Sequence, residues 1–142
     1  MIKTKNISEM LTSLIDFYNF NKNTLSKYLE ITEEEIDRVS KGDVECLPNE
    51  ADLRLRILNK IGFLYFGAIE DKDMKLCGFL KVLISFHNIS KMTIARMAGV
   101  EEKDIDKLLS NPPQEVEIET KYKVAVTVMG LRFFLKDCEP PV

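Results

Sequence analysis

The sequence has 142 residues, of which 45% are hydrophobic, and its 20 basic and 23 acidic side chains leave a formal net charge of −3. This balance is typical of a globular chain that can bury a core, and it argues against disorder. The N-terminus lacks the apolar run of a secretory signal, and no stretch reaches the roughly 18 uncharged apolar residues of a membrane span, so we expect a cytoplasmic protein with no membrane segment.

The reactive residue types are few and scattered. The three cysteines, Cys46, Cys77 and Cys138, are far apart, and with the single His87 they do not form a metal-ligand spacing. We therefore expect reduced thiols and no metal site. The sequence also contains no Gly-rich phosphate loop and no nucleophile motif, so it predicts neither an enzyme nor a cofactor.

The N-terminal third predicts three short helices. Leu11, Leu14, Ile15 and Tyr18 follow the i, i+3, i+4, i+7 rule of an amphipathic helix, with Ser8 as its N-cap. A second helix begins after an N-cap at Asn21.

A third helix begins near Thr32, since Thr32 and Glu35 form a T-x-x-E capping box. It ends near Gly42, which can adopt the left-handed conformation of a C-terminal cap. Pro48 suits the first turn of a fourth helix that runs to about Phe66.

In the second half, Ser90 caps a short helix, and the helix after it stops at Asn111-Pro112-Pro113. Residues 115–130 are ambiguous. Alternate positions are apolar and largely β-branched, which favours strands in a short β-hairpin near the C-terminus. Tyr122, Val126, Met129 and Phe133 instead fit a helix, which is the interpretation we prefer because residues 51–66 look helical.

The chain also repeats itself. Shifted by 69 residues, positions 11–37 match positions 80–106 with ten identities in 27 positions, where chance gives about one or two. The identities include Leu14/Leu83, Asn19/Asn88, Lys22/Lys91, Ile36/Ile105 and Asp37/Asp106. The sequence therefore predicts a mainly all-α fold with two similar units, residues 1–69 and 70–142.

Each copy contains two short helices joined by a tight turn. In the second copy, Ala95 lets the helices approach, Gly99 supplies a positive φ angle, and Ile105 and Leu108 face the core. The pattern resembles the helix-turn-helix of phage-repressor-like (Xre-type) proteins, over residues 11–47 and 80–113. The first copy departs from the family pattern in having Glu30 where the glycine is expected.

The resemblance implies that DNA would meet the turn and the exposed side of each third helix. Twelve positions lie there, six of them acidic and four basic. They are Thr32, Glu33, Glu34, Asp37, Arg38 and Lys41 in the first copy, and Glu101, Glu102, Lys103, Asp106, Lys107 and Ser110 in the second. The DNA-binding candidates among and beside them are Thr32, Arg38, Lys41, Arg96, Lys103 and Lys107, with Lys22 and Lys91 as further cations.

Two functions remain open on these residues. The first is a DNA-binding transcriptional regulator with two reading heads, whose partner is double-stranded DNA. The alternative is a non-enzymatic protein-interaction module that keeps the fold and uses an acidic face to bind another regulatory protein. His87 aligns with Tyr18 and is expected to pack at a helix end. Phe133 and Phe134 belong to the core, to the contact between the two units or to the surface of a homodimer.

Overall fold

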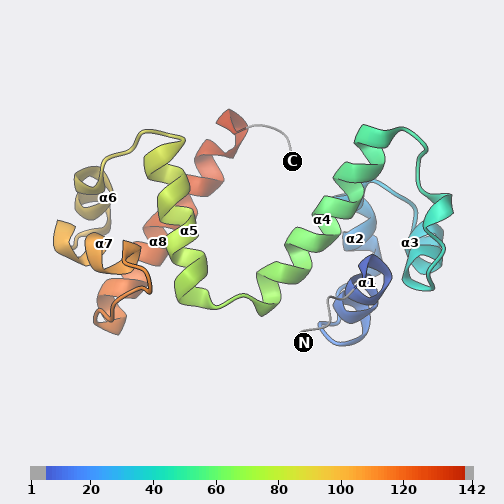
Figure 1. Ribbon diagram of the computed structural model, residues 1–142, viewed down its shortest axis with the longest axis horizontal. Helices are drawn as coiled ribbons and strands as arrows, with labels where there is room; N and C mark the ends of the chain where they lie inside the picture. The colour runs from blue at the N-terminus through green and yellow to red at the C-terminus, as the bar shows by residue number, and fades with distance from the viewer. Residues whose placement is uncertain (1–5, 140–142) are drawn as a thin grey trace. The chain divides into compact units, whose positions relative to one another are not determined.

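The computed structural model describes residues 6–139, which form α-helices and short 3-10 helices and no strand (Figure 1). The expected all-α fold is confirmed. The chain divides into two compact units between Ile69 and Glu70. Unit 1 contains α1 (Ile7–Asp16), α2 (Lys22–Leu29), α3 (Glu33–Ser40), η1 (Val44–Cys46) and α4 (Ala51–Ile69). Unit 2 contains α5 (Lys72–Ser85), α6 (Lys91–Ala98), α7 (Glu102–Leu109), α8 (Ile118–Leu135) and η2 (Lys136–Cys138).

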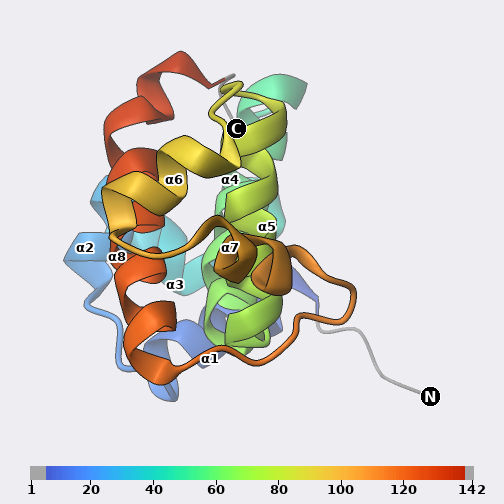
Figure 2. The same cartoon turned by 90° about the vertical axis from the view of Figure 1, so that its left-hand side faces the viewer.

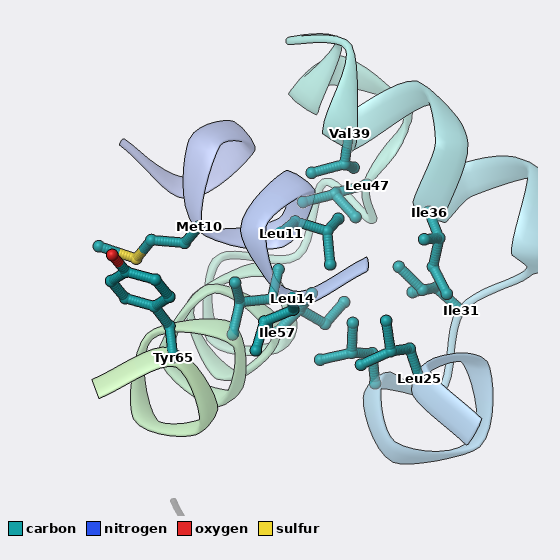
Figure 3. Packing of buried hydrophobic residues seen from close by; sticks show 12 residues of the cluster. Met10, Leu11, Leu14, Leu25, Ile31, Ile36, Val39, Leu47, Ile57 and Tyr65 are labelled. Atoms are coloured by element: carbon teal, nitrogen blue, oxygen red, sulfur yellow. The ribbon is translucent and has the colours of Figure 1, made fainter. Parts of the chain in front are cut away.

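The core of unit 1 is formed by one side of each of its four α-helices (Figure 3). The side chains of Leu11 and Leu14 on α1 are fully buried, and they meet Leu25 of α2 and Ile36 of α3. Each such side chain contributes about 1.5–3 kcal/mol by leaving water. The long α4 closes the core with Ile57, Ile61 and Tyr65.

The core of unit 2 is built in the same way from α5 to α8. In this unit α8 lies against α5 and α6, and α7 packs against the same two helices (Figure 2). Its buried residues are Leu76, Leu80, Leu83, Ile94, Ala95, Ala98, Ile105, Leu108, Val124 and Val128. The helices α6 and α7 each have eight residues, as do α2 and α3.

The helix-turn-helix turns depend on one residue of positive φ in each unit. Glu30 follows α2 with a φ of 58°, and Gly99 follows α6 with a φ of 73°. In both turns the N–H of the next residue donates to a carbonyl in the preceding helix, from Ile31 to Ser26 (3.3 Å) and from Val100 to Ala95 (3.0 Å). The left-handed conformation therefore reverses the chain at both places, although only Gly99 adopts it without steric cost.

The loop before each helix-turn-helix also needs a left-handed residue. Asn19 and Asn88 have φ angles of 58° and 56°. Asparagine tolerates this region better than most residues with a Cβ. Their identity in the two halves of the sequence thus has a conformational reason.

Several predicted helix ends are confirmed. The side chain of Asn21 accepts hydrogen bonds from the N–H groups of Asn23 (2.8 Å) and Thr24 (3.2 Å). The N–H of Glu35 donates to Thr32 Oγ1 (3.1 Å), and the N–H of Thr32 donates to Glu35 Oε1 (3.1 Å), which completes the capping box. After α3, Gly42 has a φ of 101° and its N–H donates to the carbonyl of Val39 (3.0 Å).

Two predicted helix starts are wrong. Asn6 rather than Ser8 caps α1, because its Oδ1 accepts the N–H of Glu9 (2.8 Å). Pro48 lies before α4, which begins only at Ala51. The carbonyl of Pro48 instead accepts a hydrogen bond from Arg54 Nε (3.2 Å), so the proline belongs to a loop that this arginine braces.

The ambiguous segment near the C-terminus is helical, and the β-hairpin alternative is wrong. A strand would place Val124, Val126 and Val128 on one face. In α8 the first and last of these are fully buried, whereas Val126 is 56% exposed on the other side of the helix. Packing against α5 and α6 thus makes this segment a helix, although its β-branched residues alternate as they would in a strand.

Ile36 and Ile105 are both fully buried, as their equivalent sequence positions predict. We expect Ile36→Ala and Ile105→Ala each to lower the free energy of unfolding by about 2–5 kcal/mol, because each leaves a cavity under a short helix. Chemical denaturation followed by circular dichroism measures this. Leu55→Ala, at a residue 57% exposed, serves as the control and should change stability by less than about 0.5 kcal/mol.

The strained turn at Glu30 gives a second prediction. Glu30→Gly should stabilise unit 1 by about 1 kcal/mol, because glycine removes the steric cost of positive φ. Gly99→Ala should destabilise unit 2 by a similar amount through the backbone alone, since no atom lies within 4 Å of an added Cβ. The control is Glu30→Gln, which removes the charge and keeps the Cβ. An equal gain in melting temperature from Glu30→Gly and Glu30→Gln would contradict the prediction.

Candidate nucleic-acid interface

The residues that the second helix of each helix-turn-helix buries in the core determine which of its residues face the solvent. On α3, Ile36 and Val39 face the core, so Glu33, Asp37 and Lys41 form an outer row along the helix. Glu34 and Arg38 form a second row beside it. Both rows begin at the N-terminal turn, where the positive end of the helix dipole favours carboxylates.

The same two rows occur on α7 with a different charge. Glu102, Asp106 and Ser110 form the first row, and Lys103 and Lys107 form the second. Because the acidic Glu34 of α3 corresponds to Lys103 here, the second row of α7 is wholly basic. Arg96 on α6 adds a further exposed cation to this unit.

The structure places the six predicted site residues at the surface of their own units. Thr32, Arg38, Lys41, Arg96 and Lys103 are exposed, and Lys107 is half-buried. Thr32 is already used as the N-cap of α3, because its hydroxyl also lies 3.0 Å from Glu35 Oε1. It is therefore primarily a capping residue, and its hydroxyl is free for another acceptor only if this contact opens.

The cations divide into paired and unpaired groups. The Arg38 guanidinium contacts Asp43 Oδ2 at 2.7 Å, and the hydrogen bond with this carboxylate raises the pKa of Arg38. Lys103 Nζ lies 3.0 Å from Glu101 Oε2, and the hydrogen bond between them likewise raises the pKa of Lys103. Within residues 6–139, Lys41, Arg96 and Lys107 have no ion pair, so they are the cations most readily available to a phosphate.

One ion pair recurs in both units. Lys22 Nζ at the start of α2 lies 2.6 Å from Asp37 Oδ1 on α3, and Lys91 Nζ at the start of α6 lies 2.7 Å from Asp106 Oδ1 on α7. The hydrogen bond to the aspartate raises the pKa of each lysine, whose ammonium group is already charged at neutral pH. Each pair links the two helices of one helix-turn-helix across its surface. We refer to them as the two clamp pairs.

The sequence reasoning named all four clamp residues, but as separate members of a DNA-facing surface. The sequence predicts Lys22 and Lys91 only as further cations for DNA. The sequence did contain a sign of the pairing, because both members recur at the same separation in the two halves. The clamp pairs neutralise charge at the centre of each candidate interface.

A second polar cluster lies away from these surfaces, in unit 2. His87 Nε2 is 3.0 Å from Glu139 Oε1, and Arg132 Nη2 donates to Glu139 Oε2 at 3.1 Å. The hydrogen bond with His87 and the charge of Arg132 hold the pKa of the Glu139 carboxyl below its ordinary value. The His87 side chain is 6% exposed, in agreement with a packing position at a helix end. The cluster attaches the residue after η2 to the loop that follows α5.

None of the helices in the part of the chain that the structure describes is both long and apolar enough to cross a membrane.

A family model described as a helix-turn-helix domain matches residues 2–141. No curated protein and no solved structure matches the sequence. Helix-turn-helix domains as a class bind DNA by placing their second helix in the major groove. Because the match extends over nearly all of its residues, the chain belongs to this family of helix-turn-helix domains.

Proposed function

We propose that this protein binds double-stranded DNA through both of its units and regulates transcription. The observation that carries the proposal is the pair of exposed second helices, α3 and α7, each of which follows a left-handed turn and buries an isoleucine on its inner side. A helix fixed in this way presents its N-terminal turn to a groove without needing to rearrange.

We further propose that residues 1–69 and 70–142 are tandem copies of one Xre-type unit. The support is the 69-residue repeat together with the left-handed residues and clamp pairs that occur at equivalent positions. One chain would then carry two reading heads and engage two half-sites about one helical turn apart, as a repressor dimer does with two chains.

The two heads arrange their cations differently. In unit 2 the cations are Arg96, Lys103 and Lys107, and the last two lie in one row of α7. In unit 1 the cations are Arg38, Lys41 and Lys27, which is the counterpart of Arg96, and Thr32 lies where the N-terminus of α3 would approach the backbone. Carboxylates on the same rows repel phosphate groups at short range, so they disfavour any DNA site that places phosphates against them. Among the bases, they can accept a hydrogen bond only from donors such as the N4 amino group of cytosine.

This charge distribution predicts how affinity depends on salt. Each neutralised phosphate contributes a slope of about −0.9 to the logarithm of the affinity against the logarithm of the salt concentration. With few unpaired cations, non-specific binding should be weak and its slope shallow. Tight binding should then require a particular sequence.

A titration of genomic DNA fragments at about 50 mM salt tests the proposal. The wild type should select some fragments, and Arg38→Ala/Lys107→Ala should lose that selection because both reading heads lose a cation. The matched control is Arg56→Ala/Lys81→Ala, which removes the same residue types from exposed positions on α4 and α5. Equal losses in the two double variants would show that net charge rather than the helix-turn-helix surface determines binding.

The clamp pairs give an opposite prediction. Asp37→Asn/Asp106→Asn removes two carboxylates and releases Lys22 and Lys91, so non-specific binding should strengthen and its salt slope should steepen by about 2. Fluorescence anisotropy with a random duplex over a salt series measures both quantities. Asp52→Asn/Asp137→Asn, an equal charge change at exposed positions elsewhere, should leave the slope almost unchanged.

The second candidate function is a protein-interaction module that binds a basic regulatory protein. It is favoured by the same clamp pairs, since they leave the acidic residues Glu33 and Glu102 beside lysines that are already neutralised. No binding of any fragment at about 50 mM salt would favour this function over DNA binding.

A further inference from the structure

The helix α8 carries apolar residues on two opposite sides. Val124 and Val128 are fully buried in the core of unit 2. On the other side, five exposed residues follow one another at intervals of four, four, three and four positions and so lie along one line of the helix. They are Ile118 (85% exposed), Tyr122 (68%), Val126 (56%), Met129 (52%) and Phe133 (65%). We call this set the outer stripe.

The outer stripe is continuous, which distinguishes it from the corresponding side of α4. On α4 the core residues are Ile57, Ile61 and Tyr65. Its exposed apolar residues Phe63, Phe66 and Ile69 occupy only the C-terminal half of the helix, and Asn59 separates them from the exposed Leu55. No polar residue interrupts the row on α8. A helix that is apolar on both sides normally has a partner on both sides.

The exposed area is sufficient for such a partner. From the sizes of these five side chains, the outer stripe presents roughly 600 Å² of surface, at the top of the range for the largest apolar patch on a monomer. Two copies brought together would remove about 1,200 Å² from water before any flanking residue is counted. This is the lower bound of a standard specific interface.

The charges at the ends of the stripe identify the partner. Glu115, Glu117 and Glu119 are exposed around the start of α8, where Lys123 Nζ lies 3.6 Å from Glu119 Oε1, and Lys136 and Asp137 are exposed just beyond its end. Lys136 Nζ is 5.1 Å from the centre of the Phe133 ring. Two α8 helices lying antiparallel would place the glutamates at the start of each near Lys136 of the other. A parallel pair would bring the three glutamates of one copy against those of the other, so the antiparallel orientation is favoured.

We propose that the outer stripe is a homodimer interface, and that its partner is the α8 of a second copy of this chain in antiparallel orientation. Val126 lies near the middle of the stripe, so the two-fold axis passes close to it. The proposal concerns assembly alone and does not depend on whether the helix-turn-helix surfaces bind DNA.

Sedimentation equilibrium of the full chain over a micromolar concentration range tests the proposal. The wild type should be a reversible dimer. Val126→Glu should raise the dissociation constant at least about tenfold, because it brings two carboxylates together at the axis. The substitution is at an exposed position, and circular dichroism verifies that the variant is folded.

Phe134→Glu is the matched control. Phe134 is 74% exposed on the same helix, but it lies one residue beyond Phe133 and therefore about 100° around the helix from it. This variant should dimerise as the wild type does. Equal loss of dimer in both variants would overturn the proposal, as would a wild type that is monomeric at every concentration.

A charge exchange tests the orientation. Lys136→Glu should weaken the dimer, because the altered end would meet the acidic end of the second copy. Glu117→Lys/Lys136→Glu should restore it by exchanging the two signs. Failure of the double variant to recover more association than Lys136→Glu alone would overturn the antiparallel arrangement.

Discussion

Ile36 and Ile105 hold eight-residue helices that would not persist by themselves. An isolated helix shorter than about 12–15 residues is marginal in water, because nucleation costs more than so few hydrogen bonds recover. Here α3 and α7 each bury two residues of their inner side, Ile36 with Val39 and Ile105 with Leu108. The identity of the buried residues determines which residues face outward. Every functional property of these helices therefore depends on that packing.

The electrostatics of the two units follow from this geometry. With Ile36 inside, Asp37 is directed to the solvent side and lies within reach of Lys22, and the same holds for Asp106 and Lys91. The clamp pairs connect the helices of each unit and also reduce the positive charge available to DNA. The clamp pairs thus connect the geometry of each helix-turn-helix with the salt dependence of its DNA binding. Because they neutralise part of the surface, the specificity of binding would come from contacts with bases rather than with phosphates.

The surface of α8 raises a separate question of assembly. A short helix buries one side and exposes a polar one, as α3 and α7 do, whereas α8 is apolar on both sides. Its length allows a continuous row of five exposed apolar residues, which the eight-residue helices could not carry. A dimer formed along this row would cover that surface and bring two copies of the chain into one particle, whatever ligand the helix-turn-helix surfaces take.

The sequence alone was enough for many of the local features of this protein, although not for the starts of α1 and α4. The caps at Asn21, Thr32 and Ser90, the left-handed positions at Gly42 and Gly99, and the buried positions at Ile36 and Ile105 all follow from residue type and spacing within a few residues. These features are decided by interactions along the chain, such as a side chain that accepts a nearby N–H.

Only the tertiary structure decided the features that depend on distant residues. Burial of Val124 and Val128 against α5 and α6 makes residues 118–135 a helix despite their β-branched alternation. Contact between helices pairs Lys22 and Lys91, which the sequence predicted only as further cations for DNA, with Asp37 and Asp106. The sequence left Phe133 between core and surface, and packing of the opposite side of α8 places it outside. A pattern along the chain specifies which side of a helix is apolar, but when two sides are apolar only the neighbouring helices determine which one is buried.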